Sequence, residues 1–512
     1  MLIKIPSAAH LGLDSIGVDV EINVANRGLP GFDIVGLPDK AVDESKERVR
    51  TAIINSGIEF PQKKIIINLA PADIPKEGSL YDLPMGVGIL ATTLQFEIPP
   101  KSLFFGELSL DGSLRHTKGA LLFALFAKQA GFEKLFVPAP SANEAAIVRG
   151  IEVYPVENIS QIIAHCNKTI AIEPAVFSAP GAEEIGAADF DMAEILGQEK
   201  AKRAMEIASA GGHNILLVGS PGAGKTMLAR ALPGILPLLS EEESLEVTKI
   251  FSAAGIIPPG GSLVRIRPFR SPHHTISQIG LTGGGARPQP GEITLSHRGV
   301  LFLDEFNEFP RSVVEAMRQP LESGWVTISR SRARVTYPSR FMLVASANPC
   351  PCGYLNHPKK SCSCSLKEIQ KYKKRISGPI LDRIDLHVEV SDVDPRELLQ
   401  DRIPTAGENS TAVRERVVKA RSMQEERFRE EGIHANAEMG NKHIKKYCRM
   451  EKETEQLLTK AALSFHLSAR TYFKVIKMAR TIADLAESPE IQTSHLAEAL
   501  QYRSKAYDQE GV

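Results

Sequence analysis

The chain has 512 residues, of which 43% are hydrophobic and 24% are charged, a composition typical of soluble globular proteins. Lys and Arg together number 61, as do Asp and Glu, so the zero net charge excludes a chain-wide basic surface for nucleic acid or membrane. No apolar run approaches the ~18 residues of a membrane-spanning helix, and the N-terminus lacks the apolar stretch of a signal peptide. We therefore expect a cytoplasmic protein with no membrane partner.

Residues 1–172 are predicted to form an α+β domain. Apolar runs typical of strands occur at Val18–Val24, Lys64–Asn68 and Leu135–Val137. Helical periodicity occurs at Asp39–Ser56 and Lys118–Ala130. This mixture of short strands and helices predicts an N-terminal α+β domain within an α/β multidomain protein.

Three further regions follow. Residues 173–190 are rich in Pro, Ala and Gly and indicate a linker. Alternating strand and helix patterns over 191–395 predict an α/β domain with a parallel sheet. Residues 396–512 are mostly helical by periodicity and have few prolines, so we expect a C-terminal helical domain.

The most specific motif is a phosphate loop, which lies between the apolar strand 214–218 and a helix that opens at Met227. Its glycines let backbone N–H groups surround a phosphate, and the helix N-terminus adds partial positive charge. We expect Lys225 to reach the β- and γ-phosphates of ATP, and the Thr226 hydroxyl to hold Mg²⁺. The predicted nucleotide-binding residues are Gly219, Ser220, Pro221, Gly222, Ala223, Gly224, Lys225 and Thr226.

Two acidic residues end a second apolar strand, Gly299–Leu303. Asp304 is placed to join the Mg²⁺ coordination sphere, because carboxyl ends of parallel strands meet at one edge of a sheet. Glu305 is predicted to orient or deprotonate the attacking water. A solvated strand end is the alternative, which the preceding phosphate loop disfavours.

Three polar residues complete the predicted catalytic set. Asn348 follows a third strand, Phe341–Ala345, and is expected to contact the γ-phosphate or the water, although Asn before Pro is ordinarily a turn residue. Arg383 lies where a ring ATPase places an arginine finger; a salt bridge is the alternative. Arg470 follows the expected helix cap Ser468 and could report the nucleotide state, or be an ordinary solvated residue.

Four of the six cysteines lie close together in the sequence. Two C-x-C pairs could bind Zn²⁺ tetrahedrally, although C-x₂-C spacing is more usual. Four reduced thiols in a loop are the alternative. The predicted ligands are Cys350, Cys352, Cys362 and Cys364.

Together these motifs resemble the magnesium-chelatase-like AAA+ proteins, within them the ComM group, also called YifB-like. The resemblance covers nearly the whole chain and includes Asp191–Asn214, Phe269–His274, Pro290–Glu305, Ser346–Gly353, Ser377–Val390 and Ala479–Leu485. It implies homohexameric rings that drive branch migration of DNA, including in natural transformation, with other recombination proteins as possible partners. The resemblance implies the roles given above for seven residues: Lys225, Thr226, Asp304, Glu305, Asn348, Arg383 and Arg470. It leaves open whether Arg470 acts on the nucleotide of its own subunit or of a neighbour.

Two segments offer local positive charge for DNA. A hairpin is predicted after Glu322, with alternation that places Arg330, Arg332 and Arg334 on one face, where they could track phosphates. Solvated charges on an exposed strand are the alternative. The segment Arg265–His274 reads as a proline-stiffened basic insert, and a metal site at His273 and His274 is a weaker idea.

The N-terminal domain resembles the Lon-protease-like domain of this family. Where active Lon-type proteases carry a catalytic Ser and Lys, this chain carries Leu80 and Phe123, which cannot act as nucleophile or base. Ser79 and Lys118 are nearby but displaced. We therefore expect a non-proteolytic domain that serves assembly or binding.

Three other functions are alternatives to a DNA motor, and a feature of the sequence opposes each of them. A chelatase ATPase subunit would lack the N-terminal domain and the C-P-C motif. A protease is opposed by Leu80 and Phe123. A scaffold that binds ATP without hydrolysing it is opposed by Glu305 and Arg383.

Overall fold

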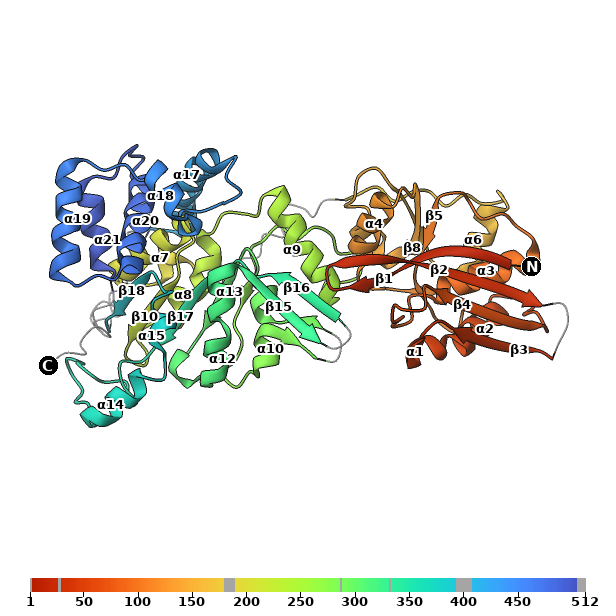
Figure 1. The fold of residues 1–512 in the computed structure, drawn as a ribbon, viewed down its shortest axis with the longest axis horizontal. Helices are drawn as coiled ribbons and strands as arrows, with labels where there is room; N and C mark the ends of the chain where they lie inside the picture. The colour runs from red at the N-terminus through yellow and green to blue at the C-terminus, as the bar shows by residue number, and fades with distance from the viewer. Residues whose placement is uncertain are drawn as a thin grey trace. The chain divides into compact units, whose positions relative to one another are not determined.

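The computed structural model describes residues 2–25, 29–178, 189–285, 288–330, 333–392 and 408–503. Its contacts divide the chain into two compact units, each of mixed helices and strands (Figure 1). Unit 1 comprises Met1–Glu184 and Glu241–Val264, and unit 2 comprises Ile185–Ser240 and Arg265–Val512. In the ranges given above, every helix is too short or too polar to cross a bilayer.

Unit 1 is built on a sheet with strand order β1-β2-β4-β3, formed by β1 (Leu2–Leu11), β2 (Asp14–Ala25), β4 (Lys64–Ala70) and β3 (Gly31–Val35). Buried Val18, Val20 and Ile22 alternate with more exposed polar residues, so one face of β2 packs on the core. Helix α3 (Asp82–Leu94) covers that face. It approaches closely at Gly88, where an added Cβ would lie 2.3 Å from Ile22 Cδ1.

The rest of unit 1 adds a parallel sheet of β5 (Ser102–Phe104), β8 (Lys134–Pro138) and β9 (Glu152–Val156), and a ribbon of β6 (Glu107–Leu108) and β7 (Leu114–Arg115). Its helices are α1 (Lys40–Asp43), α2 (Ser45–Asn55), α4 (Ala120–Gln129), η1 (Ala139–Ser141), α5 (Ala142–Ala145), α6 (Ile159–Cys166) and α9 (Glu241–Ala254). The strands and helices predicted here are confirmed, with the first predicted helix divided at Glu44 into α1 and α2.

Helix α9 belongs to unit 1 although it follows the phosphate loop in the sequence. Its Ser252 hydroxyl donates to Glu144 Oε1 over 2.6 Å, and both side chains are buried. Burial raises the pKa of Glu144. No finding bears on the predicted boundaries of the three domains, which stay a prediction.

His10 of β1 gives unit 1 a defined response to acid. The centroid of its ring lies 4.2 Å from that of Phe123. Burial lowers the pKa of His10 to about 4, while Lys118 raises it through a backbone hydrogen bond and lowers it through its charge. The unfolded chain takes up this proton near pH 6.5 and the folded chain does not. The folded state should therefore lose about 2–3 kcal/mol of stability as the pH falls from about 7 to 4.5.

The measurement is urea unfolding at both pH values, for wild type and for His10→Gln. Because glutamine does not titrate, the variant should show a shallower decline with acid, whatever its stability at pH 7. Equal declines in the two proteins would contradict this account of His10.

Unit 2 contains a parallel sheet with order β11-β14-β17-β10-β18. The strands are β11 (Phe269–Arg270), β14 (Val300–Leu303), β17 (Met342–Ala347), β10 (Ile215–Gly219) and β18 (Leu386–Val390). The strands predicted at β10, β14 and β17 are confirmed. Since the strands are parallel, β10, β14 and β17 end at the same edge, which is where the sequence motifs lie.

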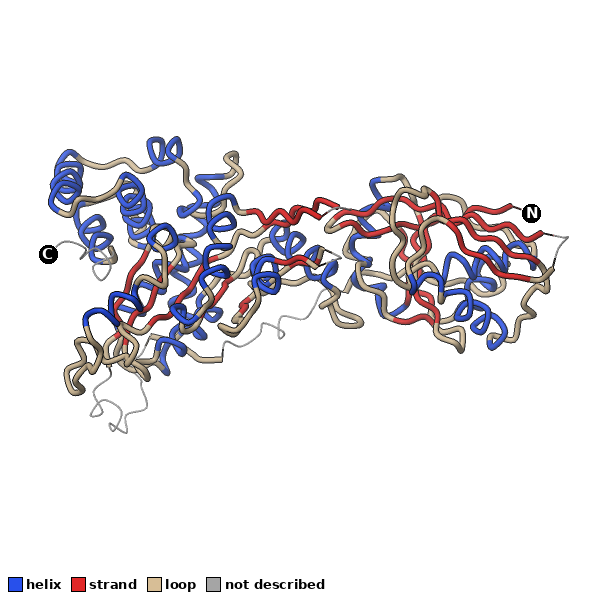
Figure 2. The backbone as a smooth tube through the Cα atoms, turned by 60° about the horizontal axis from the view of Figure 1, so that its bottom comes forward, coloured by secondary structure: helices blue, strands red, loops and turns tan. Residues whose placement is uncertain are grey.

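Helices α7 (Glu199–Gly211) and α8 (Lys225–Ile235) pack on this sheet. The helices α17 (Ser410–Phe428), α18 (Asn441–Tyr447), α19 (Lys452–Ser464), α20 (Ala469–Leu485) and α21 (Thr493–Gln501) form the predicted C-terminal helical part. Their buried residues share one hydrophobic core with β10 and α8, and α17 and α20 lie beside α7 (Figures 1 and 2). The predicted cap is confirmed, because Ser468 Oγ accepts from Thr471 N over 3.2 Å.

The remaining elements lie between the strands and helices given above or next to them. They are η3 (Met192–Glu194), α10 (Gln278–Thr282), β12 (Gly283–Gly284), β13 (Gln289–Pro290), α11 (Glu292–Leu295), η4 (Phe306–Glu308), α12 (Arg311–Ala316), α13 (Arg318–Ser323), β15 (Trp325–Arg330), β16 (Ala333–Pro338), α14 (Leu366–Lys373), α15 (Gly378–Leu381) and η5 (Asn436–Glu438).

The hairpin of β15 and β16 is confirmed, but the predicted face of its arginines is wrong. Position 330 pairs with Ala333, and Arg334 pairs with Ser329, so positions 330 and 334 fall on opposite faces. The alternation within each strand does not continue across the connection between them. Arg334 is exposed, whereas Arg332 and the side chain of Arg330 lie outside the described residues.

Candidate functional site

The phosphate loop joins β10 to α8, as its motif predicts. Gly222 and Gly224 adopt φ values of +85° and +88°, which side chains other than glycine rarely tolerate. An added Cβ at either glycine meets no heavy atom within 4 Å, so the loop encloses open space. Lys225 Nζ donates to the carbonyl oxygens of Gly219 and Ser220 over 2.7 and 2.8 Å.

The predicted magnesium ligands lie side by side. Thr226 Oγ1 donates to Asp304 Oδ2 over 2.9 Å, across the edge between α8 and β14. The other carboxylate oxygen of Asp304 accepts from the Ser346 hydroxyl and, over 3.0 Å, from the backbone N–H of Glu305. Asp304 is thereby held in one orientation by groups from β17 and from its own strand end.

The backbone of Glu305 has a conformation that is uncommon for its residue type. Its φ is +53°, in the left-handed region where a Cβ is crowded, and such strain is frequent at functional sites. Its side chain is 57% exposed, so the carboxylate is accessible to water. His274 Nδ1 lies 3.6 Å from Glu305 Oε2, beyond hydrogen-bonding distance.

Asn348 comes from the third strand end and meets the phosphate loop directly. Its Oδ1 accepts from Lys225 Nζ over 3.1 Å. The structure therefore brings Lys225, Thr226, Asp304 and Asn348 together by hydrogen bonds, with Glu305 adjacent to Asp304. These residues come from three separate motifs, which span 123 positions between Lys225 and Asn348.

This arrangement fits a nucleotide phosphate and a divalent cation. The Lys225 side chain is 9% exposed, and burial lowers the pKa of its ammonium, so an anionic group beside it would be stabilised. The hydroxyl of Thr226 and the carboxylate of Asp304 are oxygen ligands of the kind that Mg²⁺ prefers. The phosphates of ATP with Mg²⁺ therefore fit the open space at the phosphate loop, and their negative charge compensates the buried Lys225 ammonium.

Arg383 lies outside this hydrogen-bonded group and pairs with Glu322 instead. Arg383 is only 7% exposed, and its Nη2 lies 2.5 Å from Glu322 Oε2. The hydrogen bond and charge of Arg383 lower the pKa of Glu322, with smaller contributions from Arg470 and Arg318. Arg470 itself is exposed at the start of α20.

The expectation of a proline-stiffened basic insert over Arg265–His274 is wrong in part. Phe269 and Arg270 form the edge strand β11, and Arg270 makes a bidentate pair with Glu292 over 2.6 and 2.8 Å. Its charge is thus matched within the unit. The rings of His273 and His274 lie 4.1 Å apart, but His274 faces Glu305.

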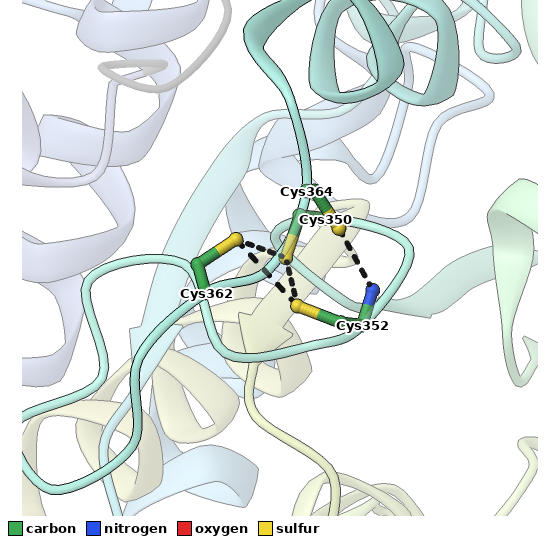
Figure 3. A group of neighbouring side chains, drawn as sticks. All are labelled: Cys350, Cys352, Cys362 and Cys364. Carbon is green, nitrogen blue, oxygen red and sulfur yellow. Dashed lines mark hydrogen bonds between the residues drawn. The ribbon is translucent and has the colours of Figure 1, made fainter.

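The four cysteines predicted to bind metal converge from both ends of one loop (Figure 3). Their sulfur atoms all lie within 4.8 Å of one another, and all four are free thiols. Backbone hydrogen bonds, first from Tyr354 and then from Ser363, lower the pKa of the Cys352 thiol to about 6. The cluster follows Asn348 directly in the sequence.

In unit 1, the two positions compared with a protease site are apolar packing positions. Phe123 is fully buried, and its ring stacks on Phe105 with centroids 4.1 Å apart. Leu80 is half-buried against the core. The Ser79 hydroxyl donates to Glu107, so it is hydrogen-bonded to a carboxylate rather than to a lysine.

Several contacts of this region were not predicted from sequence. Ser346 bonds Asp304, His274 faces Glu305, and Ser220 of the phosphate loop donates to Asp392. Asp392 also lies 2.5 Å from His357 Nε2. Of these residues, only Ser346 could have been predicted from the sequence, because it lies near the end of the strand that Asn348 follows.

Comparison with known proteins agrees with these motifs. Residues 191–398 match the family model "Magnesium chelatase, subunit ChlI", residues 20–141 match "Subunit ChlI of Mg-chelatase", and residues 407–503 match its C-terminal part. The chain is 42% identical over 500 residues to YifB of Escherichia coli K12, covering 97% of this chain and 96% of that protein.

Two other relatives differ in how much of the chain they match. Competence protein ComM of Haemophilus influenzae is 40% identical over 502 residues, which cover 97% of this chain and 96% of ComM. The magnesium-chelatase 38 kDa subunit of Cereibacter sphaeroides is 27% identical over 176 residues, which cover 31% of this chain and 53% of that subunit. The chain thus belongs to the magnesium-chelatase-like AAA+ family, in the group that contains YifB and ComM.

Proposed function

We propose that the protein is an ATP hydrolase that works as a homohexameric DNA motor, a branch-migration helicase of recombination and natural transformation. The observation that carries the ATPase part is the convergence of Lys225, Thr226, Asp304 and Asn348 at one sheet edge. Its cofactors are ATP and Mg²⁺, together with Zn²⁺ at the cysteine cluster. We place the activity in the cytoplasm.

The residues divide the chemistry among themselves. The loop N–H groups and Lys225 hold the phosphates, and Thr226 and Asp304 would hold Mg²⁺, which neutralises phosphate charge when bound. Glu305 accepts a proton from the attacking water, since its carboxylate is exposed and its residue directly follows Asp304. Asn348 and Lys225 fix each other's orientation through their hydrogen bond.

The ring part of the proposal rests on Arg383 and Arg470. Arg383 pairs with Glu322, and the charge of Arg470 also acts on that carboxylate. In a ring, we propose that Arg383 exchanges Glu322 for the nucleotide of a neighbouring subunit and acts as an arginine finger. Arg470 would report the nucleotide state to the C-terminal helices, which would then act as a lid.

The DNA part is supported by local positive charge in unit 2. A groove of about 640 Å³ lies between η4, α12 and α14, and its basic lining residues are Arg311, Lys367, Lys371, Lys374 and Arg375. The exposed Arg334 of the hairpin adds a further cation. Such clusters hold phosphate backbones without reading bases. The chain is also similar over nearly its whole length to a protein named for competence.

For unit 1 we propose a Lon-protease-like fold without proteolysis. The buried Phe123 and half-buried Leu80 supply no nucleophile or base. The domain would serve assembly or the binding of DNA or of another recombination protein.

The alternative is the ATPase subunit of a magnesium chelatase, which remodels a protein partner. The family model that matches 191–398 carries that name. The extent of similarity favours the motor, because the chelatase subunit of Cereibacter sphaeroides aligns with only 31% of this chain, whereas ComM aligns with 97%.

The experiment compares wild type, Lys225→Ala and the exposed-lysine control Lys200→Ala. Removing the buried ammonium should lower ATP hydrolysis at least ~100-fold, while Lys200→Ala stays at the wild-type rate. Branch migration on a synthetic four-way junction should follow the same order.

Two outcomes would separate the parts of this proposal. A wild-type chain that hydrolyses ATP at the same rate with single-stranded, forked or junction DNA as without DNA would remove the DNA motor. A wild-type chain that neither binds nor hydrolyses ATP with Mg²⁺ would remove the whole proposal.

A further inference from the structure

The loop between Asn348 and helix α14 has two features that the hydrolysis mechanism leaves unused. It carries the four clustered thiols, and it touches the phosphate loop at several points. Residues 348–365 contain no helix or strand, so their backbone is not held by a hydrogen-bonded ladder. If this segment is to hold one position, an interaction other than regular secondary structure must fix it.

The sulfur positions match those of a single tetrahedral ion. Cys350 Sγ lies 3.4 Å from Cys352 Sγ and 3.7 Å from Cys362 Sγ, and the latter two are 3.5 Å apart. A tetrahedral Zn²⁺ with bonds of about 2.3 Å places its sulfur ligands about 3.8 Å apart. Disulfides would require about 2.05 Å, so the four thiols are arranged for a shared ion rather than for cross-linking.

The chemistry of the donors limits the common ions to zinc or a single iron. Four sulfur ligands in tetrahedral geometry are typical of Zn²⁺ or of iron, whereas Mg²⁺ and Ca²⁺ take oxygen. Sulfur atoms that all lie within 4.8 Å leave space for one ion rather than for a cluster of several. Cys364 completes the set and accepts from the Cys352 backbone N–H over 3.4 Å.

The same loop touches the phosphate loop at Gly353, directly after Cys352. Gly353 is buried with a φ of +82°, and an added Cβ would lie 2.5 Å from Pro221 Cδ. The backbone of the cysteine loop therefore rests on the phosphate loop with no room for a side chain. This contact is sensitive to any movement of Cys352.

Two polar contacts join the loops on either side of Gly353. Before the cluster, Asn348 accepts from Lys225 Nζ over 3.1 Å. Within the loop, His357 Nε2 lies 2.5 Å from Asp392, which accepts from the Ser220 hydroxyl. The His357 side chain is only 9% exposed, whereas that of Asp392 is 31% exposed.

We propose that Cys350, Cys352, Cys362 and Cys364 hold one zinc ion, and that this ion supports the nucleotide site by fixing the loop that rests on Pro221. The inference rests on the proposed binding of ATP. Zinc loading then controls nucleotide affinity, because the phosphate loop is supported only while the thiols are tied together. If the untied loop occupies its packed position about one-tenth of the time, the apparent affinity for MgATP falls about tenfold.

The first experiment uses the full chain as wild type, as Cys362→Ser/Cys364→Ser, and as Cys166→Ser. Cys166 is a free thiol of unit 1 far from the cluster in sequence, so it is the matched control. Elemental analysis should find one zinc per chain in wild type and in the control, and none in the double variant. Titration with a fluorescent ATP analogue and Mg²⁺ should show a dissociation constant about tenfold higher for the double variant only.

A second variant tests the support without disturbing the thiols. Gly353→Ala should keep its zinc and still weaken binding of the ATP analogue, since the methyl group collides with Pro221. Because zinc content reports that the loop has folded, this variant separates lost support from lost folding. Wild-type affinity in Gly353→Ala, or in the double variant, would overturn the coupling.

The outcomes also separate this inference from the proposed function. Wild-type chain produced with ample zinc but isolated without it, or with iron in its place, would overturn the zinc site. Wild-type chain that carries zinc but binds no ATP analogue would remove the proposed ATPase and the coupling that depends on it, while the metal site remains.

Discussion

Replacing Glu305 by Gln should lower ATP hydrolysis by about 10²–10⁴-fold and leave the binding of MgATP nearly unchanged. Glutamine keeps the size of the side chain and its ability to accept a hydrogen bond, but it cannot take a proton from water. Asp304 should still be oriented by Ser346 and by the backbone N–H of residue 305. The change therefore removes the base without removing the magnesium ligands.

The measurement is steady-state phosphate release, together with equilibrium binding of a fluorescent ATP analogue with Mg²⁺. Glu315→Gln is the matched control, because Glu315 on α12 pairs only at 3.8 Å with its helix neighbour Arg318. Both activities of this control should equal those of wild type. A Glu305→Gln chain that hydrolyses ATP within a few-fold of wild type would exclude Glu305 as the base.

A companion variant distinguishes the two neighbouring acids. Asp304→Asn should weaken binding of MgATP as well as hydrolysis, because the neutral amide is a poorer ligand for Mg²⁺ and removes the charge beside Thr226. The two acids differ in exposure, with Asp304 partly buried and Glu305 open to water. Weaker MgATP binding in Asp304→Asn, with unchanged binding in Glu305→Gln, would separate the magnesium ligand from the base.

The parts of the site that the sequence predicted are those encoded locally. The phosphate loop is one continuous motif between a strand and a helix, and β14 and β17 are apolar runs that end in polar residues. Since parallel strands share one carboxyl edge, these strand ends had to meet. Hence the proximity of Lys225, Asp304 and Asn348 could be predicted from the sequence.

The parts that the sequence could not predict depend on contacts between distant residues. Arg383 and Glu322 are 61 positions apart, and Ser220 and Asp392 are 172 apart. No periodicity links such pairs, because the packing of whole elements decides them. The zinc ligands were proposed from spacing, but the contact between Gly353 and Pro221 has no signal in the sequence.

The arginine hairpin shows a different kind of failure. Alternation is reliable within one strand, and Val326, Ile328, Val335 and Tyr337 are buried together on one face as a period of two requires. The error came from extending that period through the connection to the second strand. The register there is set by the turn, so Arg334 lies on the face opposite to position 330.

Asp484→Asn should destabilise unit 2 by about 3–5 kcal/mol, the largest stability effect that we expect from one substitution in this chain. Asp484 is fully buried in α20 and binds two arginines, with Arg427 Nη2 at 2.5 Å and Arg480 Nε at 3.0 Å from its Oδ1. Arg480 is 1% exposed. Asparagine keeps the shape but leaves both guanidinium groups without their carboxylate, and its amide N–H groups oppose their donors.

Chemical unfolding followed by far-ultraviolet circular dichroism measures this effect, with Glu487→Gln as the matched control. Glu487 lies three residues further on, and its pair with Lys419 spans 3.6 Å between side chains that are each 68% exposed. The control should change stability by less than about 0.5 kcal/mol, since exposed pairs contribute little. Similar losses in both variants would mean that removing a negative charge from this region destabilises it generally. A large loss in Asp484→Asn alone would identify the pairing of this buried carboxylate with Arg427 of α17 and Arg480 of α20 as the cause.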